Sequence, residues 1–339
     1  MIKATLVVYD KTLLQNRIFD SKLDVEAHDG RLFKYIALKK EFSKQNIELC
    51  TQDIYPVGES KYNIYLDTIL LPLNHANKLN TYLIILEPPS VLTTNFKKSC
   101  HSYFNKIFTW DDKLVDNKKY YKFNFSYDIK SRSNQEFKKD KFCVIICRKK
   151  FSNWIDELYS LRLELINWFE KNEPKKLDLY GYGWSRIVFK TYPLTFLNRF
   201  VFLTRLIYSL FKSKINIYHG EIESKADVLN RYKFSFCYEN IQNIDGYITE
   251  KIFDCFFSGT IPIYLGAKNI EKFIPKECFI DARKFANIKD IYDYINSMEN
   301  KEYIKYIRAI KNFLKSEKAR YFDAEYNAKL IVNTILKNQ

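Results

Sequence analysis

An acid, a base and aromatic residues gather in the stretch 232–275, where an apolar run gives way to a helical pattern. The run that begins at Tyr232 predicts a buried strand, and Thr249, Glu250 and Lys251 open the helix. In open α/β sheets, ligands bind outside the carboxyl ends of the strands. A helix N-terminus also offers free backbone N–H groups and a partial positive charge. This arrangement therefore indicates a site for a phosphate-bearing ligand.

Strands and helices alternate along the rest of the chain, which is typical of an α/β fold with parallel sheets. In the first half, the pattern predicts a helix at 31–44 and strands at 4–9, 47–50, 62–66, 82–86 and 107–110. In the second half, it predicts strands at 142–147, 177–180 and 260–265, and helices at 153–170, 288–298, 302–314 and 324–336. The segment 123–141 is polar and rich in lysine without an apolar period, so we place the domain boundary there.

The stretch 232–275 resembles the donor-binding motif of the α-1,3/1,4-fucosyltransferases, glycosyltransferase family 10, in its bacterial or viral type. The blocks that carry the resemblance are, in order, Tyr232-Lys233-Phe234, Tyr238-Glu239-Asn240, Tyr247-Ile248-Thr249-Glu250-Lys251 and Ile261-Pro262-Ile263-Tyr264-Leu265-Gly266. The resemblance implies a GT-B-like fold, in which two Rossmann-like domains face a central cleft. It gives an acceptor domain at 1–138, a GDP-sugar domain at 139–320 with an insert at about 185–220, and a C-terminal helix in 321–339 that packs back on the first domain.

The resemblance implies that the residues at the start of the motif helix hold the nucleotide. Lys251 would contact the pyrophosphate together with backbone N–H groups and neutralise charge on the departing GDP. Glu250 would hydrogen-bond the ribose hydroxyls, because a carboxylate can accept two such bonds. Thr249 would be the N-cap. Without the motif, the same residues also fit a solvated lysine and a favourable acid in the first helical turn.

Further donor-binding residues are implied at matching positions. Arg162 would reach the pyrophosphate with its planar guanidinium, although an arginine that only packs along a helix surface is the alternative. Lys225 is another phosphate candidate. The residues around the turn after the motif strand would line the donor site: Glu239, Asn240 and Tyr247. The strand before Arg162 ends in Cys147-Arg148, where the family has Ser-Asn.

Glu87 ends the apolar run 82–86 and stands directly before Pro88-Pro89. The resemblance implies that this glutamate is the general base of the acceptor domain. An inverting transfer needs a carboxylate that takes the proton of the acceptor hydroxyl while that oxygen attacks C1 of the sugar. The alternative is a solvated acid at the end of a strand.

The sequence predicts neither a metal site nor a required cofactor. Asp111-Asp112 follow a short strand and do not form a nucleotide–metal motif. The histidines have no spacing typical of metal ligands: His28, His75, His101 and His219. We expect a divalent ion to stimulate the reaction at most.

Charge and cysteine content indicate which cellular compartment and which binding partners fit the chain. The net charge is +15 and the pI about 9.2, which fits a solvated lysine-rich surface as well as an anionic membrane or a phosphate-bearing donor. The cysteines, 7 in number and without a CxxC pair, predict free thiols in a reducing compartment. The chain has neither a signal-peptide pattern at its start nor a run of about 18 apolar residues, so we expect a cytoplasmic protein. The segment 193–214 fits either a basic amphipathic helix on the inner face of a membrane or an ordinary core helix.

The resemblance implies an inverting glycosyltransferase that moves L-fucose from GDP-fucose to a hydroxyl of a GlcNAc- or Glc-containing glycan, within a surface polysaccharide or a lipid-linked oligosaccharide. Two alternatives stay open. One is a transferase of another nucleotide sugar, and the other is a non-catalytic, basic, membrane- or nucleic-acid-binding protein on a transferase scaffold. The intact block 247–251 argues against the second alternative, so we expect no nucleic-acid partner.

Overall fold

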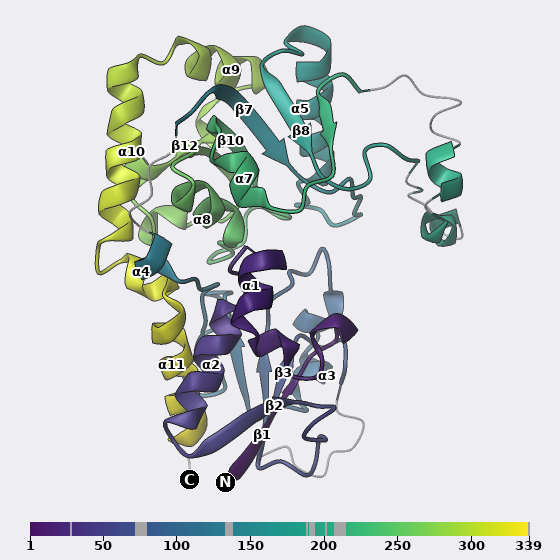
Figure 1. Ribbon diagram of the computed structural model, residues 1–339, viewed down its shortest axis with the longest axis vertical. Coiled ribbons are helices and arrows are strands. Elements are labelled where there is room, and N and C mark those ends of the chain that lie inside the picture. The colour runs from purple at the N-terminus through teal and green to yellow at the C-terminus, as the bar shows by residue number, and fades with distance from the viewer. Residues whose placement is uncertain are drawn as a thin grey trace.

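The protein consists of two stacked α/β lobes in a computed structural model that describes residues 1–27, 29–71, 80–132, 138–187, 189, 194–200, 202–206 and 215–337. Each lobe is built on a 6-stranded parallel sheet with helices packed against it (Figure 1). Central strands of both sheets are buried along their whole length, as expected when helices cover both faces of a parallel sheet. The predicted α/β class is confirmed.

The first sheet has the strand order β2-β1-β3-β4-β5-β6. Its strands are β1 (Ile2–Val7), β2 (Ile47–Thr51), β3 (Tyr62–Leu66), β4 (Thr81–Ile84), β5 (Lys106–Thr109) and β6 (Tyr120–Lys122). Its helices are α1 (Ser21–Ala27), α2 (Phe33–Ser43) and α3 (Lys98–His101). The order reverses between β1 and β3, so the segments that follow β1, β3 and β4 leave the sheet at the edge where such folds bind ligands.

The second sheet has the strand order β12-β11-β10-β7-β8-β9. Its strands are β7 (Lys141–Ile146), β8 (Leu177–Tyr180), β9 (Tyr218–Gly220), β10 (Tyr232–Tyr238), β11 (Ile261–Leu265) and β12 (Ile280–Asp281). Its helices are α5 (Tyr159–Asn172), α7 (Lys225–Leu229), α8 (Glu250–Phe257), α9 (Ile288–Ser297) and α10 (Asn300–Leu314). This is the strand order of dinucleotide-binding Rossmann sheets, with the reversal between β7 and β10.

The last helix, α11 (Ala324–Leu336), lies beside α2 of the first lobe, whereas α10 runs along the second lobe (Figure 1). Its apolar side chains enter the core of the first lobe: Ala328, Ile331, Val332 and Ile335. On the rim, Lys40 Nζ lies 3.2 Å from the carboxylate of Glu325, an exposed ion pair that adds little stability. Burial of this apolar face therefore holds α11 on the first lobe.

The segment 123–141 differs from the prediction, because its first part is not a polar linker. Phe123, Phe125 and Tyr127 are buried, and the ring of Tyr127 stacks on Phe253 of α8 with centroids 4.7 Å apart. Tyr127 also exchanges backbone hydrogen bonds with the segment before α11. An aromatic residue at every second position is the signal, and the polar residues between them mask it. A continuous apolar core therefore joins the two lobes.

Helix α5 begins at Tyr159, later than the predicted range 153–170. The residues before it pair with the segment after β10, where Glu157 forms an antiparallel bridge. The Glu157 carboxylate accepts a hydrogen bond from the backbone N–H of Tyr159 at 2.6 Å and so fixes the first turn. This tertiary pairing outweighs the helical pattern, and it puts the N-terminal end of α5, with Arg162, beside β7 and β10.

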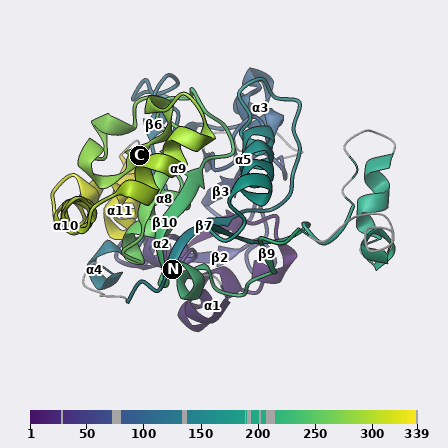
Figure 2. The same cartoon turned by 90° about the horizontal axis from the view of Figure 1, so that it is seen from above.

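Between β8 and β9, the described residues 194–200 and 202–206 lie away from the second lobe (Figures 1 and 2). Its described residues form a 3-10 helix at Leu194–Arg199 and a short helical stretch at 202–206. Several apolar side chains there are exposed: Phe196, Phe200, Phe202 and Leu206. The rest of the predicted amphipathic helix 193–214 lies outside the described residues. Across the described ranges, we find no helix with the length and apolarity needed to cross a bilayer.

Candidate active site

A cavity of about 410 Å³ lies at the carboxyl ends of β7 and β10, where the order of the second sheet reverses. Its wall holds more basic than acidic side chains, and Arg31 of the first lobe contributes to it. The charged residues of the wall are Arg31, Arg148, Lys150, Arg162, Lys225, Lys251, Glu250 and Asp254. An excess of positive charge in a recessed site favours an anionic ligand.

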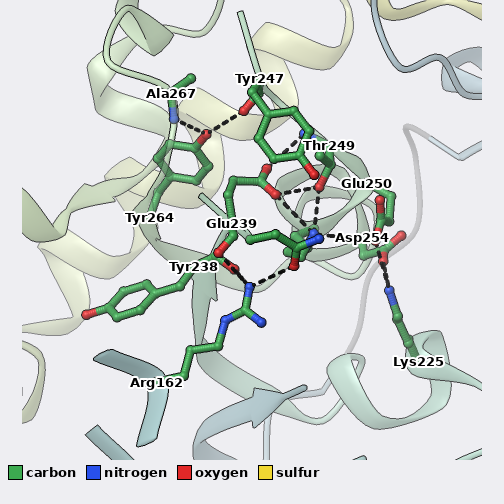
Figure 3. Close-up of polar contacts among 12 residues, drawn as sticks. Arg162, Lys225, Tyr238, Glu239, Tyr247, Thr249, Glu250, Asp254, Tyr264 and Ala267 are labelled. Carbon is green, nitrogen blue, oxygen red and sulfur yellow. Dashed lines mark hydrogen bonds and ion pairs between the residues drawn. The ribbon is translucent and has the colours of Figure 1, made fainter. Parts of the chain in front are cut away.

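Glu239 organises the entrance to α8 (Figure 3). Its side chain is fully buried, at 0% exposure, and its carboxylate accepts hydrogen bonds from the backbone N–H of Thr249 at 2.8 Å and from the Thr249 hydroxyl at 2.6 Å. Lys251 Nζ lies 3.0 Å from the same carboxylate. A Cβ added to Gly266 would stand 2.4 Å from Glu239 Cγ, so glycine is required beside this carboxylate. Glu239 thus positions Thr249 and Lys251 from behind the cavity wall.

Thr249 occupies the N-cap position of α8, but its side chain makes no capping hydrogen bond. Its hydroxyl donates to Glu239 and accepts a hydrogen bond from Lys251 Nζ at 2.9 Å. The predicted capping role is therefore corrected, since stronger charged partners take the hydroxyl. A helix N-terminus whose cap side chain is engaged elsewhere can offer backbone N–H groups to an anion.

Opposite charges fix the protonation of the residues that begin α8. Burial alone lowers the pKa of Lys251, but Glu239 and Glu250 outweigh it and hold this pKa well above its usual range. Burial alone raises the pKa of Glu250, but Lys251 and Lys225 outweigh it and hold this pKa well below its usual range. Lys225 Nζ lies 3.1 Å from Asp254 and 3.6 Å from Glu250. At neutral pH, α8 therefore presents a charged pair to the cavity.

Arg162 is 5% exposed and ties α5 to the end of β10. Its Nη2 donates to the carbonyl oxygens of Tyr238 at 2.7 Å and Glu239 at 2.6 Å, and to Asn240 Oδ1 at 3.2 Å. Within the described part of the chain, Nη2 makes all the hydrogen bonds of this guanidinium group. The N–H groups of Nε and Nη1 can therefore donate to a ligand. Figure 3 shows the Arg162 side chain pointing toward the main chain of Tyr238 and Glu239.

The structure brings a majority of the predicted donor residues to this cavity, namely Arg162, Lys225, Asn240, Glu250 and Lys251. It places Glu239, Tyr247 and Thr249 outside the wall. Tyr247 is 2% exposed, and its ring lies 4.6 Å from Trp110 and 6.1 Å from Phe125 of the first lobe, between centroids. Tyr247 therefore packs in the core between the lobes.

Asp112 also belongs to the contact between the lobes. Lys122 Nζ lies 2.5 Å from its carboxylate, and Asn269 Nδ2 donates to it at 2.7 Å. A Cβ added to Gly246 would stand 2.2 Å from the carbonyl oxygen of Trp110, so the two segments touch backbone to backbone. Among the residues that the structure describes, no group of three or more His, Cys, Asp or Glu side chains is arranged to hold a metal ion.

The described histidines make hydrogen bonds within the fold. His101 Nε2 lies 2.7 Å from the carbonyl oxygen of Asn95, and His219 Nε2 lies 2.9 Å from Asp178 Oδ1. His28 and His75 lie outside the described residues.

Glu87 stands just beyond the carboxyl end of β4, where hydrogen bonds fix its main chain. Asp67, which follows β3, accepts through Oδ1 from the backbone N–H groups of Leu86 at 2.7 Å and Glu87 at 3.1 Å. Asn95 Nδ2 donates to the Glu87 carbonyl at 3.0 Å and to Asp67 Oδ1 at 2.7 Å. Trp110 Nε1 donates to the Leu86 carbonyl at 3.1 Å. We call Asp67, Leu86, Glu87, Asn95 and Trp110 the Glu87 cage.

Asp67 holds this cage together at a cost. It is 1% exposed, its φ of 59° lies in the left-handed region, and its Oδ2 is a buried oxygen without a hydrogen-bond partner in the described ranges. A residue other than glycine is rarely found in this region, and such strain gathers at functional sites. The strain therefore marks the Glu87 cage as a candidate functional element.

The charges that act on Glu87 come from both lobes. Burial raises the pKa of Glu87, Asp67 raises it further, and Lys150 and Lys251 of the second lobe oppose them. Glu250 adds to the raised pKa. Glu87 is not part of the cavity wall, but a carboxylate whose pKa is raised is a stronger base than an ordinary glutamate.

Several residues of the site are not among those predicted from the sequence: Arg31, Asp67, Asn95, Arg148, Lys150 and Tyr159. The run Arg148-Lys149-Lys150 directly after β7 is a usable signal, because residues after a strand at the reversal point face the ligand site. Arg31 and Asp67 carry no such signal, because they reach the site from the other lobe.

The family model described as glycosyltransferase family 10 (fucosyltransferase) C-term matches residues 209–329, which include β10 and α8. The alpha-(1,3)-fucosyltransferase FucT of Helicobacter pylori is 38% identical over 91 residues, which are 27% of this chain and 17% of that protein. The alpha-(1,4)-fucosyltransferase of Arabidopsis thaliana is 36% identical over 70 residues, 21% of this chain and 17% of that protein. The chain thus spans less than a fifth of the length of these two relatives.

Two solved structures share the fold. An alpha1,3-fucosyltransferase with GDP-fucose has a TM-score of 0.51 at 17% identity, over 90% of this chain and 81% of that chain. Anabaena Alr3699/HepE in complex with UDP and glucose has a TM-score of 0.57 at 10% identity, over 99% and 100% of the two chains. These likenesses confirm the predicted GT-B-like fold. Residues 209–329 of the chain are similar to the C-terminal domain of glycosyltransferase family 10, the fucosyltransferases.

Proposed function

We propose that the protein is an inverting fucosyltransferase, which moves L-fucose from GDP-fucose to a hydroxyl of a glycan acceptor. One observation carries the proposal: Arg162, Glu250 and Lys251 line a cationic cavity at the carboxyl ends of β7 and β10, and Arg31 of the first lobe contributes to its wall. Lys251 belongs to the domain that the family model matches. A solved structure of similar fold was obtained with GDP-fucose, which makes this donor the first choice.

In the proposed reaction, the diphosphate of GDP lies against Arg162, Lys251 and the first turn of α8. Glu250 accepts hydrogen bonds from the ribose, and Lys225 and Asn240 complete the donor wall. Glu239 and Thr249 act indirectly, since they hold Lys251 in place, and Tyr247 keeps the two lobes together beside the motif.

Glu87 takes the proton of the acceptor hydroxyl while that oxygen attacks C1 of fucose. The bond between C1 and the phosphate oxygen breaks at the same time, and GDP leaves with the electron pair. This single displacement inverts the configuration at C1. Arg162 and Lys251 stabilise the charge that develops on GDP, a contribution of about 10²- to 10³-fold in rate for one preorganised group. Because these cations perform the task of a metal ion, we propose that the reaction requires no cofactor.

The acceptor in this proposal is a glycan that contains GlcNAc or Glc, free or linked to a lipid. A mouse relative, 34% identical over 85 residues, which are 24% of this chain and 23% of that protein, is named 4-galactosyl-N-acetylglucosaminide 3-alpha-L-fucosyltransferase 9. Its name supports a GlcNAc-containing acceptor. The acceptor would bind between the Glu87 cage and the cavity.

The test is release of the nucleotide by the full chain in the presence of EDTA. GDP-fucose, GDP-mannose and UDP-glucose are each offered with N-acetyllactosamine or lactose. We expect release from GDP-fucose alone, with a reduction of about 10²- to 10³-fold in Lys251→Ala. The exposed Lys305 provides the control Lys305→Ala, for which we expect the wild-type rate.

Other outcomes identify the alternatives. Release from another donor alone would make the protein a transferase of that sugar. Absence of GDP binding in calorimetry, together with salt-sensitive RNA binding, would instead support a non-catalytic protein on a transferase scaffold.

We also propose a cytoplasmic location with peripheral contact to the inner face of a membrane through 193–214. The exposed Phe196, Phe200 and Phe202 support this proposal, as does the net charge of +15. Co-sedimentation with vesicles that contain an anionic lipid tests it. We expect the double variant Phe200→Ser, Phe202→Ser to bind more weakly than the wild type, and equal binding of both proteins would refute the contact.

A further inference from the structure

The hydroxyl of Tyr159 is an unexplained polar group at the candidate active site. The side chain is 5% exposed, and its oxygen is buried without a hydrogen-bond partner in the part of the chain that the structure describes. A buried hydroxyl without a partner destabilises the folded state, because it has lost its hydrogen bonds to water. A native structure that keeps such a group at a binding site often uses it to contact a ligand.

The position of Tyr159 is fixed from two sides. Its backbone N–H donates to the Glu157 carboxylate at 2.6 Å, which sets the first turn of α5. The guanidinium carbon of Arg162 lies 5.1 Å from the centre of its ring. Tyr159 therefore does not depend on its hydroxyl to hold its place in the fold, and the ring is part of the wall of the main cavity.

The charged groups near Tyr159 define where its hydroxyl lies. Burial raises the pKa of Tyr159, Arg162 and Lys251 act against this, and Glu87 adds to it. These are the groups assigned above to the diphosphate and to the proton of the acceptor. In a single displacement, the transferred sugar lies between the leaving phosphate and the attacking oxygen. Tyr159 lines the same cavity as Arg162 and Lys251, so its ring stands beside the proposed diphosphate site, from which the sugar extends.

We propose that the Tyr159 hydroxyl hydrogen-bonds a hydroxyl of the transferred hexose, and that this residue recognises the sugar of the donor and not its nucleotide. The inference rests on the proposed function, since it takes the donor to be a nucleotide sugar. It gives the buried hydroxyl the partner that the protein does not supply. It also accounts for the late start of α5, which puts Tyr159 rather than a surface residue at the cavity wall.

The experiment compares the binding of GDP and GDP-fucose by calorimetry, without acceptor, in the full chain and in Tyr159→Phe. We expect unchanged affinity for GDP and a loss of about 3- to 10-fold in affinity for GDP-fucose, the worth of one neutral hydrogen bond. The melting temperature should stay the same or rise, because the variant loses only an unpaired hydroxyl. The control is Tyr292→Phe, which removes a hydroxyl from a buried tyrosine that packs on Trp168, away from the cavity wall.

Two results would overturn the inference. Equal losses for GDP and GDP-fucose would assign the hydroxyl to the nucleotide or the diphosphate. Unchanged affinity for both ligands would leave Tyr159 with a packing role only. If the wild-type chain binds neither ligand, the proposed function itself fails, which is a result distinct from both.

Discussion

The donor cavity and the Glu87 cage hold their charged groups in opposite ways. Lys251 of the cavity wall is paired with the buried Glu239 carboxylate behind the wall, 3.0 Å away, so its charge is matched by an opposite one. In the cage, Asp67 lies near Glu87 as a like charge, and backbone N–H groups hold it there. Paired charges keep a cation ready for a diphosphate, whereas an unpaired carboxyl with a raised pKa is suited to accept a proton. In the proposed reaction, the two lobes supply complementary parts.

The largest expected effect separates the two regions directly. Glu87→Gln removes the proposed base and leaves the donor cavity intact, so kcat should fall by about 10²- to 10⁴-fold while GDP-fucose still binds. The rate of GDP release measures the expected fall in kcat, and calorimetry measures the affinity for GDP-fucose. A variant that retains its turnover would show that the base lies elsewhere.

The next effect concerns the paired charges of the donor region. Glu239→Gln leaves Lys251 without its closest partner, and breaking a buried ion pair on one side costs about 3 kcal/mol or more of the free energy of unfolding. We expect a loss at the lower end, because the Lys251 side chain is 23% exposed. Urea denaturation measures it, with the exposed Glu223→Gln as the control. Equal stability of both variants would show that this pairing does not hold the site.

The like charges of the cage predict a change in pH dependence. The proposed base works in its ionised form, so the raised pKa of Glu87 puts the acid limb of kcat/KM at a higher pH than for an ordinary glutamate. Asp67→Asn removes the neighbouring negative charge and keeps an oxygen that can accept the two N–H bonds. The pKa of Glu87 should then fall, and the acid limb should move to lower pH.

The shift of the acid limb is measured by pH profiles of kcat/KM for the wild type, for Asp67→Asn and for the exposed control Glu59→Gln. A limb that stays in place, or moves to higher pH, would mean that Asp67 acts on Glu87 only through its backbone hydrogen bonds.

The smallest expected effect tests the charge of Asp112, which pairs with Lys122 within the first lobe and accepts a hydrogen bond from Asn269 of the second lobe. Asp112→Asn removes the ion pair with Lys122, which is about a quarter exposed on both sides, so the free energy of unfolding should fall by about 1 kcal/mol or less. Urea denaturation and turnover are the measurements. A loss of several kcal/mol would show that the charge of Asp112 stabilises the fold far more than a partly exposed ion pair normally does.

The sequence alone predicted the alternation of strands and helices, the start of α8 and the donor residues near it. These features are local: Glu239, Thr249 and Lys251 lie within one short stretch of chain, and the period of apolar residues reflects the burial of each element. A match of residues 209–329 to the family model agrees with this local character.

Other features were decided only by the tertiary structure. The late start of α5 depends on pairing with the segment after β10, and the burial of Tyr247 depends on Trp110 of the other lobe. The Glu87 cage joins side chains that follow β3, β4 and β5, and the order of the strands sets which of these ends meet. A sequence pattern records which face of an element is buried but not which distant segment covers it. For this reason the place of Glu87 at the end of a strand could be predicted from the sequence, whereas its hydrogen-bonded neighbour Asp67 and the buried Tyr159 could not.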